Sequence, residues 1–315
     1  MAGHKLLEKM QSAVGQVLFE KEEVTELMLT ALIAGGHVLL EDVPGTGKTV
    51  LAKTMASVID ASFSRIQFTP DVLPGDVTGI RFFNMKTQEF EFRKGPVMTN
   101  ILLADEINRA TPRTQSSLLE AMEEHQATVD GETHPLPEPF FVIATQNPIE
   151  SAQGTFDLPE AQMDRFLMKI QPGYPSEGGE RAMLRSYMHG RPETSAPSAG
   201  LDDIRSIRKE ALKVRVNEAV EEYLIHLVRE TRDHPDVETG ASPRGTIALM
   251  RAAQSRALLR GRDFAVPEDV RDLAVPVLVH RLSLTVEASM RKAPEEVLAS
   301  ILDRIPVPVE DVGGR

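Results

Sequence analysis

A loop suited to holding phosphate groups lies within the stretch HVLLEDVPGTGKTVLAK, residues 37–53. Backbone N–H groups must approach phosphate oxygens closely in such a loop, and Gly45 and Gly47 permit the positive φ angles that this requires. Lys48 would bring a positive charge to the outer phosphates, and the Thr49 hydroxyl would join the shell of a Mg²⁺ ion. The predicted nucleotide-binding residues are Val43, Pro44, Gly45, Thr46, Gly47, Lys48, Thr49 and Val50.

The loop departs from the usual pattern GxxxxGK[ST] at its first position, where Asp42 replaces glycine. A carboxylate beside phosphates would oppose binding, so we expect the Asp42 side chain to turn away from the nucleotide. The alternative is a Gly-Pro turn that merely precedes a helix. Residues farther along the chain decide between these two interpretations.

Two adjacent carboxylates, Asp105 and Glu106, end the apolar run ILLAD. An uncompensated pair at the end of a buried strand would be unfavourable, which favours a metal ion or an open cleft. Asp105 would orient the water shell of Mg²⁺, so the predicted metal-binding residues are Thr49 and Asp105. Glu106 would align the water that attacks the γ-phosphate, or accept its proton. Taken alone, without the phosphate loop upstream, the same pair would be interpreted as a helix cap.

Asn147 and Arg165 complete the chemistry expected at the γ-phosphate. Asn147 follows the run FFVIAT, where its amide could hydrogen-bond the attacking water or the phosphate; otherwise Asn147-Pro148 only begins a turn. Arg165 precedes the run FLMKI and could reach a nucleotide held by a neighbouring subunit. An ion pair with Asp164 is the alternative for this arginine.

Arg244 lies where an arginine needs a nearby anion. Ser242 and Pro243 are typical of a helix N-cap and first turn, so Arg244 would sit at the end where the helix dipole disfavours a cation. A nucleotide phosphate or a salt bridge to Asp or Glu would compensate. We therefore predict Glu106, Asn147, Arg165 and Arg244 as catalytic residues, with Arg93 and Arg109 as weaker candidates for contacts between subunits.

Five short apolar runs, separated by helical patterns, position these residues. The runs cover residues 37–41, 63–68, 101–105, 140–145 and 166–170. Helical periodicity precedes them at 5–33 and recurs between them, for example at 49–59 and 114–124. Alternating strands and helices indicate an α/β fold with a parallel five-stranded sheet, covered on both faces.

Two inserts interrupt this alternation, and a helical region follows it. The run GIRFFNMKTQEFEFRKGPV predicts a hairpin that turns at 84–87, and Asp130-Gly131 predicts a second hairpin. Residues 171–180 are rich in turn formers, and 189–200 is typical of a loop or linker. We predict an α/β nucleotide-binding core at 1–172 and a smaller all-α domain at 173–315.

Composition limits the possible partners. The 315 residues carry a net charge of −12, which disfavours nucleic acid unless basic residues cluster. The sequence contains no cysteine, which excludes disulfides and thiolate metal sites. No run of apolar residues reaches the length of a membrane span. We expect a cytoplasmic protein without membrane insertion.

The motifs together resemble an AAA+ ATPase, and specifically the MoxR family. The matching segments, in the family's order, are LLEDVPGTGKT, ILLADEINRATPRTQSSLLEAMEE, FFVIATQNPIE, LPEAQMDRF and ASPRGTIALMRAAQSRALLRGRDFAVPEDV. The resemblance implies a P-loop core with a helical lid, in which Lys48 and Thr49 belong to Walker A and Asp105 and Glu106 to Walker B. Asn147 matches sensor 1, Arg165 the arginine finger and Arg244 sensor 2.

The resemblance also implies a biological role. Members of the family bind ATP and Mg²⁺ and form homo-oligomeric rings, usually hexamers, that act as chaperone-like factors in the maturation of client proteins or the insertion of their cofactors. They commonly work with a von Willebrand factor A domain protein. Both predicted hairpins are similar to inserts shared with magnesium chelatase subunits and MCM helicases.

Two other functions are open from the sequence. A DNA-translocating motor of the MCM type would share both hairpins, but it would need basic hairpin tips; the first tip offers only Lys86, and the second, VDGETH, is acidic. A scaffold that binds ATP without hydrolysing it would not need Glu106. Both alternatives are less favoured than a remodelling ATPase.

Overall fold

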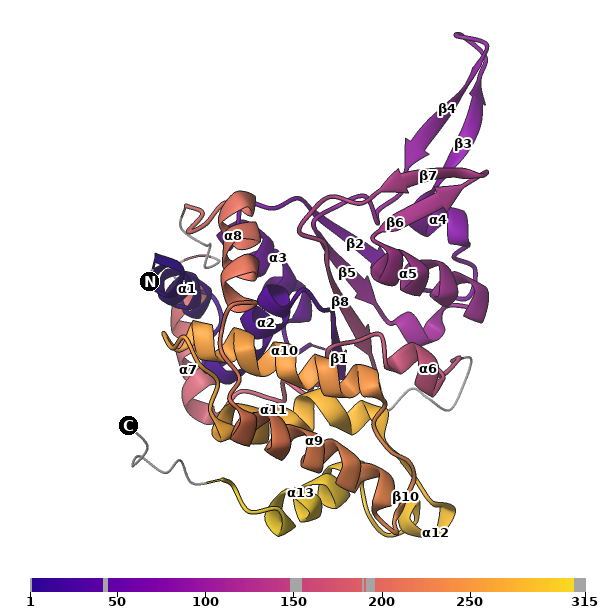
Figure 1. The fold of residues 1–315 in the computed structure, drawn as a ribbon. Helices are drawn as coiled ribbons and strands as arrows, with labels where there is room; N and C mark the ends of the chain where they lie inside the picture. The colour runs from indigo at the N-terminus through magenta and orange to yellow at the C-terminus, as the bar shows by residue number, and fades with distance from the viewer. Residues whose placement is uncertain (1, 42–44, 148–154, 189, 191–195, 309–315) are drawn as a thin grey trace.

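A parallel five-stranded sheet forms the centre of the N-terminal part of the chain (Figure 1). The computed structural model describes residues 2–41, 45–147, 155–188, 190 and 196–308. The strands are ordered β2-β5-β8-β1-β9 in the sheet. Their bounds are Val38–Glu41 for β1, Phe63–Gln67 for β2, Ile101–Asp105 for β5, Phe141–Gln146 for β8 and Met168–Ile170 for β9. All five predicted apolar runs are therefore strands of this sheet, as expected.

Alternate residues of each central strand enter two separate hydrophobic clusters. Val38 and Leu40 belong to one cluster, whereas Leu39 between them belongs to the other. Successive side chains of a strand point to opposite faces, so both faces of the sheet are buried. The first cluster includes residues of α1, α2 and α3, and the second includes residues of α5. These helices span Ala2–Gly15, Glu22–Ala34, Lys48–Val58 and Pro112–Glu124.

Short elements connect the sheet to its inserts. They are α4 (Pro74–Thr78), the 3₁₀ turn η1 (Ile107–Arg109) and α6 (Glu160–Met163). The hairpin β6–β7 pairs Gln126–Val129 with Glu132–Pro135. Its turn residues Asp130 and Gly131 both have positive φ, at 50° and 83°. This is the backbone of the two-residue turn that the Asp-Gly sequence predicts.

The other hairpin, β3–β4 (Gly79–Asn84 and Glu89–Lys94), projects away from the sheet (Figure 1). We call residues 79–94 the aromatic hairpin. Its base contacts the second hairpin, because Phe92 stacks on His134 with ring centroids 4.0 Å apart and Arg81 pairs with Glu132. It exposes large apolar side chains, namely Ile80 near the base and Phe82, Phe83, Met85 and Phe90 farther out.

The C-terminal part is almost entirely helical. Its helices are α7 (Glu177–Tyr187), α8 (Leu201–Ala211), α9 (Glu218–Asp233), α10 (Pro243–Leu259), α11 (Pro267–Leu278), η3 (Val279–Arg281), α12 (Val286–Ser289) and α13 (Pro294–Arg304). A short antiparallel ribbon, β10 (Val237–Thr239) with β11 (Ser283–Leu284), was not predicted. Residues 177–180, predicted as turn, form the start of α7 because Ser176 caps that helix. Half of the predicted loop 189–200 lies outside the described residues.

The helical part packs directly on the sheet and its leading helices. Residues of α8, α9, α10, α11 and α13 belong to the same hydrophobic cluster as α1, α2 and β1. Arg208 of α8 donates a hydrogen bond from Nε to the carbonyl of Leu32 at the end of α2, at 2.9 Å. The division at residue 172 stays a prediction. None of the helices formed by the described residues has the length and apolar character needed to cross a membrane.

A buried histidine just before β1 joins β8 and α5. The backbone N–H of Val142 in β8 donates to Nδ1 of His37 at 3.0 Å, which leaves Nε2 to donate to the carbonyl of Met122 in α5 at 3.2 Å. Burial lowers the pKa of His37 from 6.5 to about 3, against the opposing effect of the Met122 hydrogen bond. His37 is therefore neutral in the folded protein across the physiological pH range.

We predict that stability falls as the pH drops below 6.5, in part because of His37. Unfolded chains then bind a proton that folded chains exclude until the pH nears 3. From His37 alone, the free energy of unfolding should be about 2 kcal/mol lower at pH 5 than at pH 7. Urea unfolding of a His37→Gln variant should show a pH dependence that is flatter by this amount, whatever the variant's stability at pH 7. His226→Gln, at an exposed position, is the control, and equal pH dependence in both variants would contradict the prediction.

Candidate active site

The phosphate loop joins β1 to the first turn of α3. Gly45 and Gly47 have φ angles of 90° and 88°, as predicted, and Gly47 is the N-cap of a helix that begins at Lys48. The backbone N–H groups of the first helical turn and the positive end of the helix dipole therefore face the loop. The predicted contacts of Val43 and Pro44 and the orientation of Asp42 lie outside the described residues.

The predicted residues meet in one pocket of about 390 Å³ at the carboxyl ends of the strands. The parallel order β2-β5-β8-β1 brings the ends of these four strands to the same edge of the sheet. Twelve residues line the pocket: Gly45, Thr46, Gly47, Lys48, Thr49, Val50, Arg65, Gln67, Asp105, Glu106, Thr145 and Asn147. Every described residue of the predicted loop is among them, together with both predicted carboxylates and the predicted amide.

Asp105 is held by two neighbouring strands. Thr145 of β8 donates its hydroxyl to Oδ1 of Asp105 at 2.6 Å, and Arg65 of β2 donates to Oδ2 at 2.6 Å. Thr145 is buried and also accepts the backbone N–H of Glu106 at 2.9 Å, so it fixes both carboxylate residues. The counter-charge that this partly buried carboxylate needs thus comes from Arg65 in the free protein.

Glu106 is turned back toward the pocket by its backbone. Its φ and ψ of 58° and 49° lie in the left-handed region, which is uncommon for a residue other than glycine. The side chain accepts hydrogen bonds from Gln67 at 2.8 Å and from Arg109 at 3.0 Å, and both go to Oε2. Oε1 is not used by either contact. Arg109, considered from sequence as a contact between subunits, binds Glu106 of its own chain.

The pocket offers the kind of ligand atoms that Mg²⁺ prefers. The Thr49 hydroxyl and the Asp105 carboxylate line the same space, and both are hard oxygen ligands. The described residues form no cluster of three or more side chains able to bind a metal by themselves. Mg²⁺ in nucleotide sites usually binds one or two protein oxygens and completes its coordination shell with water and phosphate.

Sequence reasoning missed Arg65 and Gln67. They are two residues apart on the run FSRIQF, so they share a face of β2, and that spacing was a usable signal. Their importance depends on β2 being the neighbour of β5, with Gln67 directly opposite Asp105. Local patterns do not give the order of strands in a sheet.

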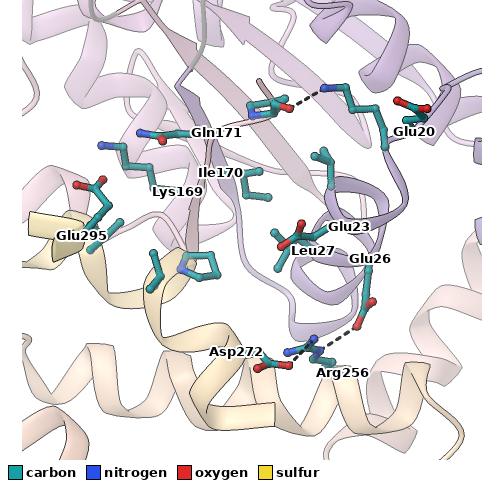
Figure 2. A pocket seen from close by; sticks show the side chains of 16 residues that line it. Glu20, Glu23, Glu26, Leu27, Lys169, Ile170, Gln171, Arg256, Asp272 and Glu295 are labelled. Carbon is teal, nitrogen blue, oxygen red and sulfur yellow. Dashed lines mark hydrogen bonds and ion pairs between the residues drawn. The ribbon is translucent and has the colours of Figure 1, made fainter. Parts of the chain in front are cut away.

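A narrow apolar slot continues from the phosphate loop toward the helical part. It is formed by the loop itself with Leu18, Val24, Leu51 and Pro172. Lys21 closes one side and donates from Nζ to the carbonyls of Pro172 and Gly173, at 2.6 and 2.7 Å. Lys21, Val24 and Pro172 also line a larger cavity of about 500 Å³, in which Arg256 lies between Glu26 and Asp272 (Figure 2).

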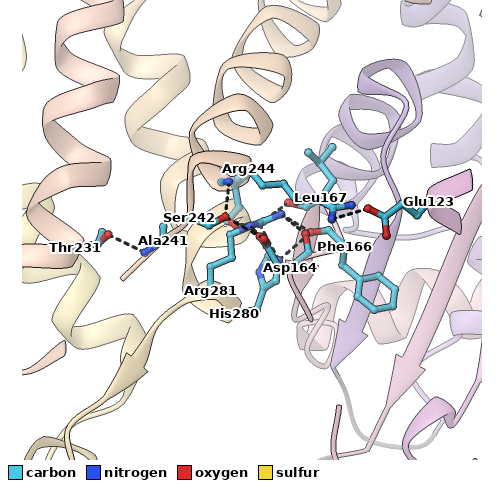
Figure 3. A network of polar contacts seen from close by, with 12 residues as sticks. Glu123, Asp164, Phe166, Leu167, Thr231, Ala241, Ser242, Arg244, His280 and Arg281 are labelled. Atoms are coloured by element: carbon cyan, nitrogen blue, oxygen red, sulfur yellow. Dashed lines mark hydrogen bonds and ion pairs between the residues drawn. The ribbon is translucent and has the colours of Figure 1, made fainter. Parts of the chain in front are cut away.

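The two predicted arginines lie elsewhere in the chain. Arg165 precedes β9, so it lies at the edge of the sheet opposite to the phosphate loop, and neither Arg165 nor Arg244 lines the nucleotide pocket. Both bind Glu123 at the end of α5: Arg165 at 2.9 Å and Arg244 at 3.2 Å (Figure 3). Ser242 caps α10 as predicted, by accepting from the N–H of Gly245. The anion beside Arg244 is thus a carboxylate in this chain, and Asp164 instead pairs with Arg281.

Comparison with known proteins agrees with this arrangement. Residues 37–168 match the ATPase family associated with various cellular activities (AAA), and residues 229–301 match the AAA lid domain. The chain is 50% identical to YeaC of Bacillus subtilis over 98% of this chain and 96% of that protein. It is 42% identical to Chaperone MoxR1 of Mycobacterium tuberculosis over 96% of this chain and 82% of that protein.

A solved structure extends the comparison to the fold. The crystal structure of a candidate ATPase from Cytophaga hutchinsonii superposes with a TM-score of 0.91 and 37% sequence identity, covering 98% of this chain and 96% of that one. The identity over nearly the full length, the two matched domains and the composition of the pocket all lead to the same assignment. The chain belongs to the MoxR family of AAA+ ATPases.

Proposed function

We propose that this protein hydrolyses ATP with Mg²⁺ in the pocket at the carboxyl ends of the strands, and that a homo-oligomeric ring uses the reaction for chaperone-like remodelling, maturation or cofactor insertion of client proteins. The observation that carries the proposal is the meeting of Lys48, Thr49, Asp105, Glu106 and Asn147 in one pocket. Each group has a separate task there.

The residues divide the work of phosphoryl transfer. Lys48 and the first turn of α3 attract the phosphates, while Thr49 and Asp105 would hold Mg²⁺, which neutralises charge on the β- and γ-oxygens when bound. Glu106 keeps Oε1 clear of Gln67 and Arg109, so this oxygen can accept a hydrogen bond from the attacking water. Asn147, buried beside the strand end, can fix that water or the phosphate without adding charge.

A Glu106→Gln variant should bind ATP but turn it over at least about 10²-fold more slowly, because a neutral amide cannot accept the proton of the attacking water. Phosphate release gives the rate, and the fluorescence of a labelled nucleotide gives the affinity. A Lys48→Ala variant, by contrast, should lose affinity for the nucleotide. Parental turnover by Glu106→Gln would remove the assigned role.

The positions of Arg165 and Arg244 support assembly into a ring. They lie at the sheet edge opposite to the phosphate loop and on a partly exposed surface. A head-to-tail interface brings different surfaces of two copies together, so this edge of one copy could face the loop of the next. The arginines would then stabilise charge on the neighbour's γ-phosphate.

Mixing two inactive variants tests this arrangement. Lys48→Ala keeps the arginines and Arg165→Ala keeps the loop, so both should be inactive alone if the arginine acts between copies. An equal mixture should recover activity at about a quarter of its interfaces, where an intact loop meets an intact arginine in a heterologous ring. Failure to recover activity in mixtures shown to co-assemble by light scattering would contradict an action in trans.

The aromatic hairpin is the surface that we propose for contact with clients. It carries exposed apolar side chains on both faces, and both of its strands have unpaired edges among the described residues. An extended, apolar segment of an unfolded protein can add to such an edge and cover such side chains. The tip offers Lys86 as its only basic residue, which does not favour DNA. A hexamer and a von Willebrand factor A domain partner remain predictions from the family resemblance.

Replacing Phe83 and Phe90 with serine should weaken client binding without affecting the ATPase reaction. Both rings are at least half exposed and form an edge-to-face pair, while Phe92 and Arg81 still anchor the hairpin. We expect turnover without client to stay within about twofold and protection of a chemically unfolded protein from aggregation to be lost. Val286→Ser with Met290→Ser, at exposed apolar positions of the helical part, is the matched control. Equal protection by both double variants would contradict this role.

A further inference from the structure

One carboxylate serves two arginines that come from distant parts of the chain. Oε2 of Glu123 binds Nε of Arg165 at 2.9 Å, and Oε1 binds a terminal nitrogen of Arg244 at 3.2 Å. Figure 3 shows Glu123 on the side of the sheet, facing the group formed by Asp164, Ser242, Arg244 and Arg281. Glu123 is the second-to-last residue of α5, a helix whose buried residues pack into the core.

The backbones that carry the two arginines are themselves tied together. Asp164, next to Arg165, accepts from Nε of Arg281 at 2.6 Å and from the hydroxyl of Ser242 at 3.0 Å. Ser242 caps the helix whose first turn carries Arg244. The side chain of Arg281 is 2% exposed and also donates to the carbonyl of Phe166 at 2.6 Å. The two arginines therefore start from a fixed base, and Glu123 determines where their guanidinium groups point.

The charges of this group do not cancel. Two guanidinium groups and one carboxylate leave a net charge of +1 on a partly exposed surface, with side-chain exposures of 28% for Arg165 and 44% for Arg244. Each guanidinium has five N–H donors, whereas a carboxylate offers about four acceptor sites. Donors therefore remain for a second anion. Without Glu123 the two cations would repel each other and separate.

The contact between Glu123 and Arg165 favours a role in which the carboxylate positions the arginine and does not block it. Glu123 approaches Arg165 at Nε, the inner nitrogen of the guanidinium, and not across its terminal nitrogens. In Arg165, the forked end that binds phosphate oxygens most strongly is thus not the part that Glu123 contacts. In Arg244, Glu123 contacts one terminal nitrogen, Nη1. A carboxylate that blocked the arginine would instead be expected across that fork.

We propose that Glu123 is the positioning carboxylate that holds Arg165 and Arg244 side by side as a two-arginine clamp for the phosphates of a nucleotide bound to a neighbouring copy. This inference rests on the proposed function, in which these arginines act across an interface. Glu123 itself contacts the clamp and not the nucleotide. Its removal should therefore change the rate of the chemical step more than the affinity for ATP.

Glu123→Ala, Glu123→Asp and Glu124→Ala test this role in the full-length protein. Glu123→Ala should lower kcat by about tenfold or more, because small displacements of a positioned group have large effects on rate. The KM for ATP should stay within about twofold, because the nucleotide pocket is untouched. Glu123→Asp should restore part of kcat. Glu124→Ala, the exposed neighbour, should retain the parental kcat, and thermal unfolding by circular dichroism shows whether each variant is folded.

A double-mutant cycle separates this role from a general loss of structure. Arg165→Ala should reduce kcat much less in the Glu123→Ala background than in the parent, because the clamp is already disordered there. An undiminished effect of Arg165→Ala would overturn the positioning role, as would a parental or higher kcat in Glu123→Ala. If Arg165→Ala and Arg244→Ala alone leave kcat unchanged, the action between copies fails and the inference falls with it. If they lower kcat and Glu123→Ala does not, only the role of Glu123 fails.

Discussion

The parallel register of β5 between β2 and β8 is the constraint on which the rest of the site depends. It sets Asp105 opposite Gln67 on one side and within reach of the Thr145 hydroxyl on the other. Thr145 in turn holds the backbone of Glu106, so one hydroxyl positions both carboxylate residues. A slip of one residue in this register would send the Asp105 side chain to the opposite face of the sheet. The burial of both faces, with separate hydrophobic clusters, makes that slip unfavourable.

The sequence allowed prediction of several features that depend on local pattern, although the helix cap at Ser176 was missed. Apolar runs gave the five strands, the Asp130-Gly131 dipeptide gave a hairpin turn, and Ser242 gave a helix cap, because each depends on a few adjacent residues. Arg65 could not be placed in the site, since its role depends on which strands are neighbours. Glu123 could not be found for the same reason: its partners lie 42 and 121 positions away (165 − 123 and 244 − 123) and meet only in the folded chain. The pattern around Arg244 predicted the need for an anion but left its identity open.

The chain separates the groups that bind a nucleotide from those that could complete its hydrolysis. Loop, carboxylates and amide lie at the carboxyl ends of the strands, whereas Arg165 and Arg244 lie at the opposite edge. In the described chain, neither arginine lines the pocket that holds the other set. This separation favours a reaction that depends on assembly, because a head-to-tail contact is the simplest way to bring opposite edges of one fold together. Hydrolysis would then report on the arrangement of neighbouring copies, which suits a protein that converts the reaction into movement.

The ion pairs of the free protein also bear on how a nucleotide is accepted. Asp105 is paired with Arg65, Glu106 with Arg109, and Glu123 with two arginines, so no functional carboxylate depends on a ligand for its counter-charge. Mg²⁺ at Asp105 would replace Arg65 as the counter-charge of that carboxylate. The released guanidinium, 44% exposed and lining the same pocket, would then lie close to the incoming phosphates. Binding therefore exchanges one pairing for another, and the pocket need not hold an unpaired carboxylate at any stage.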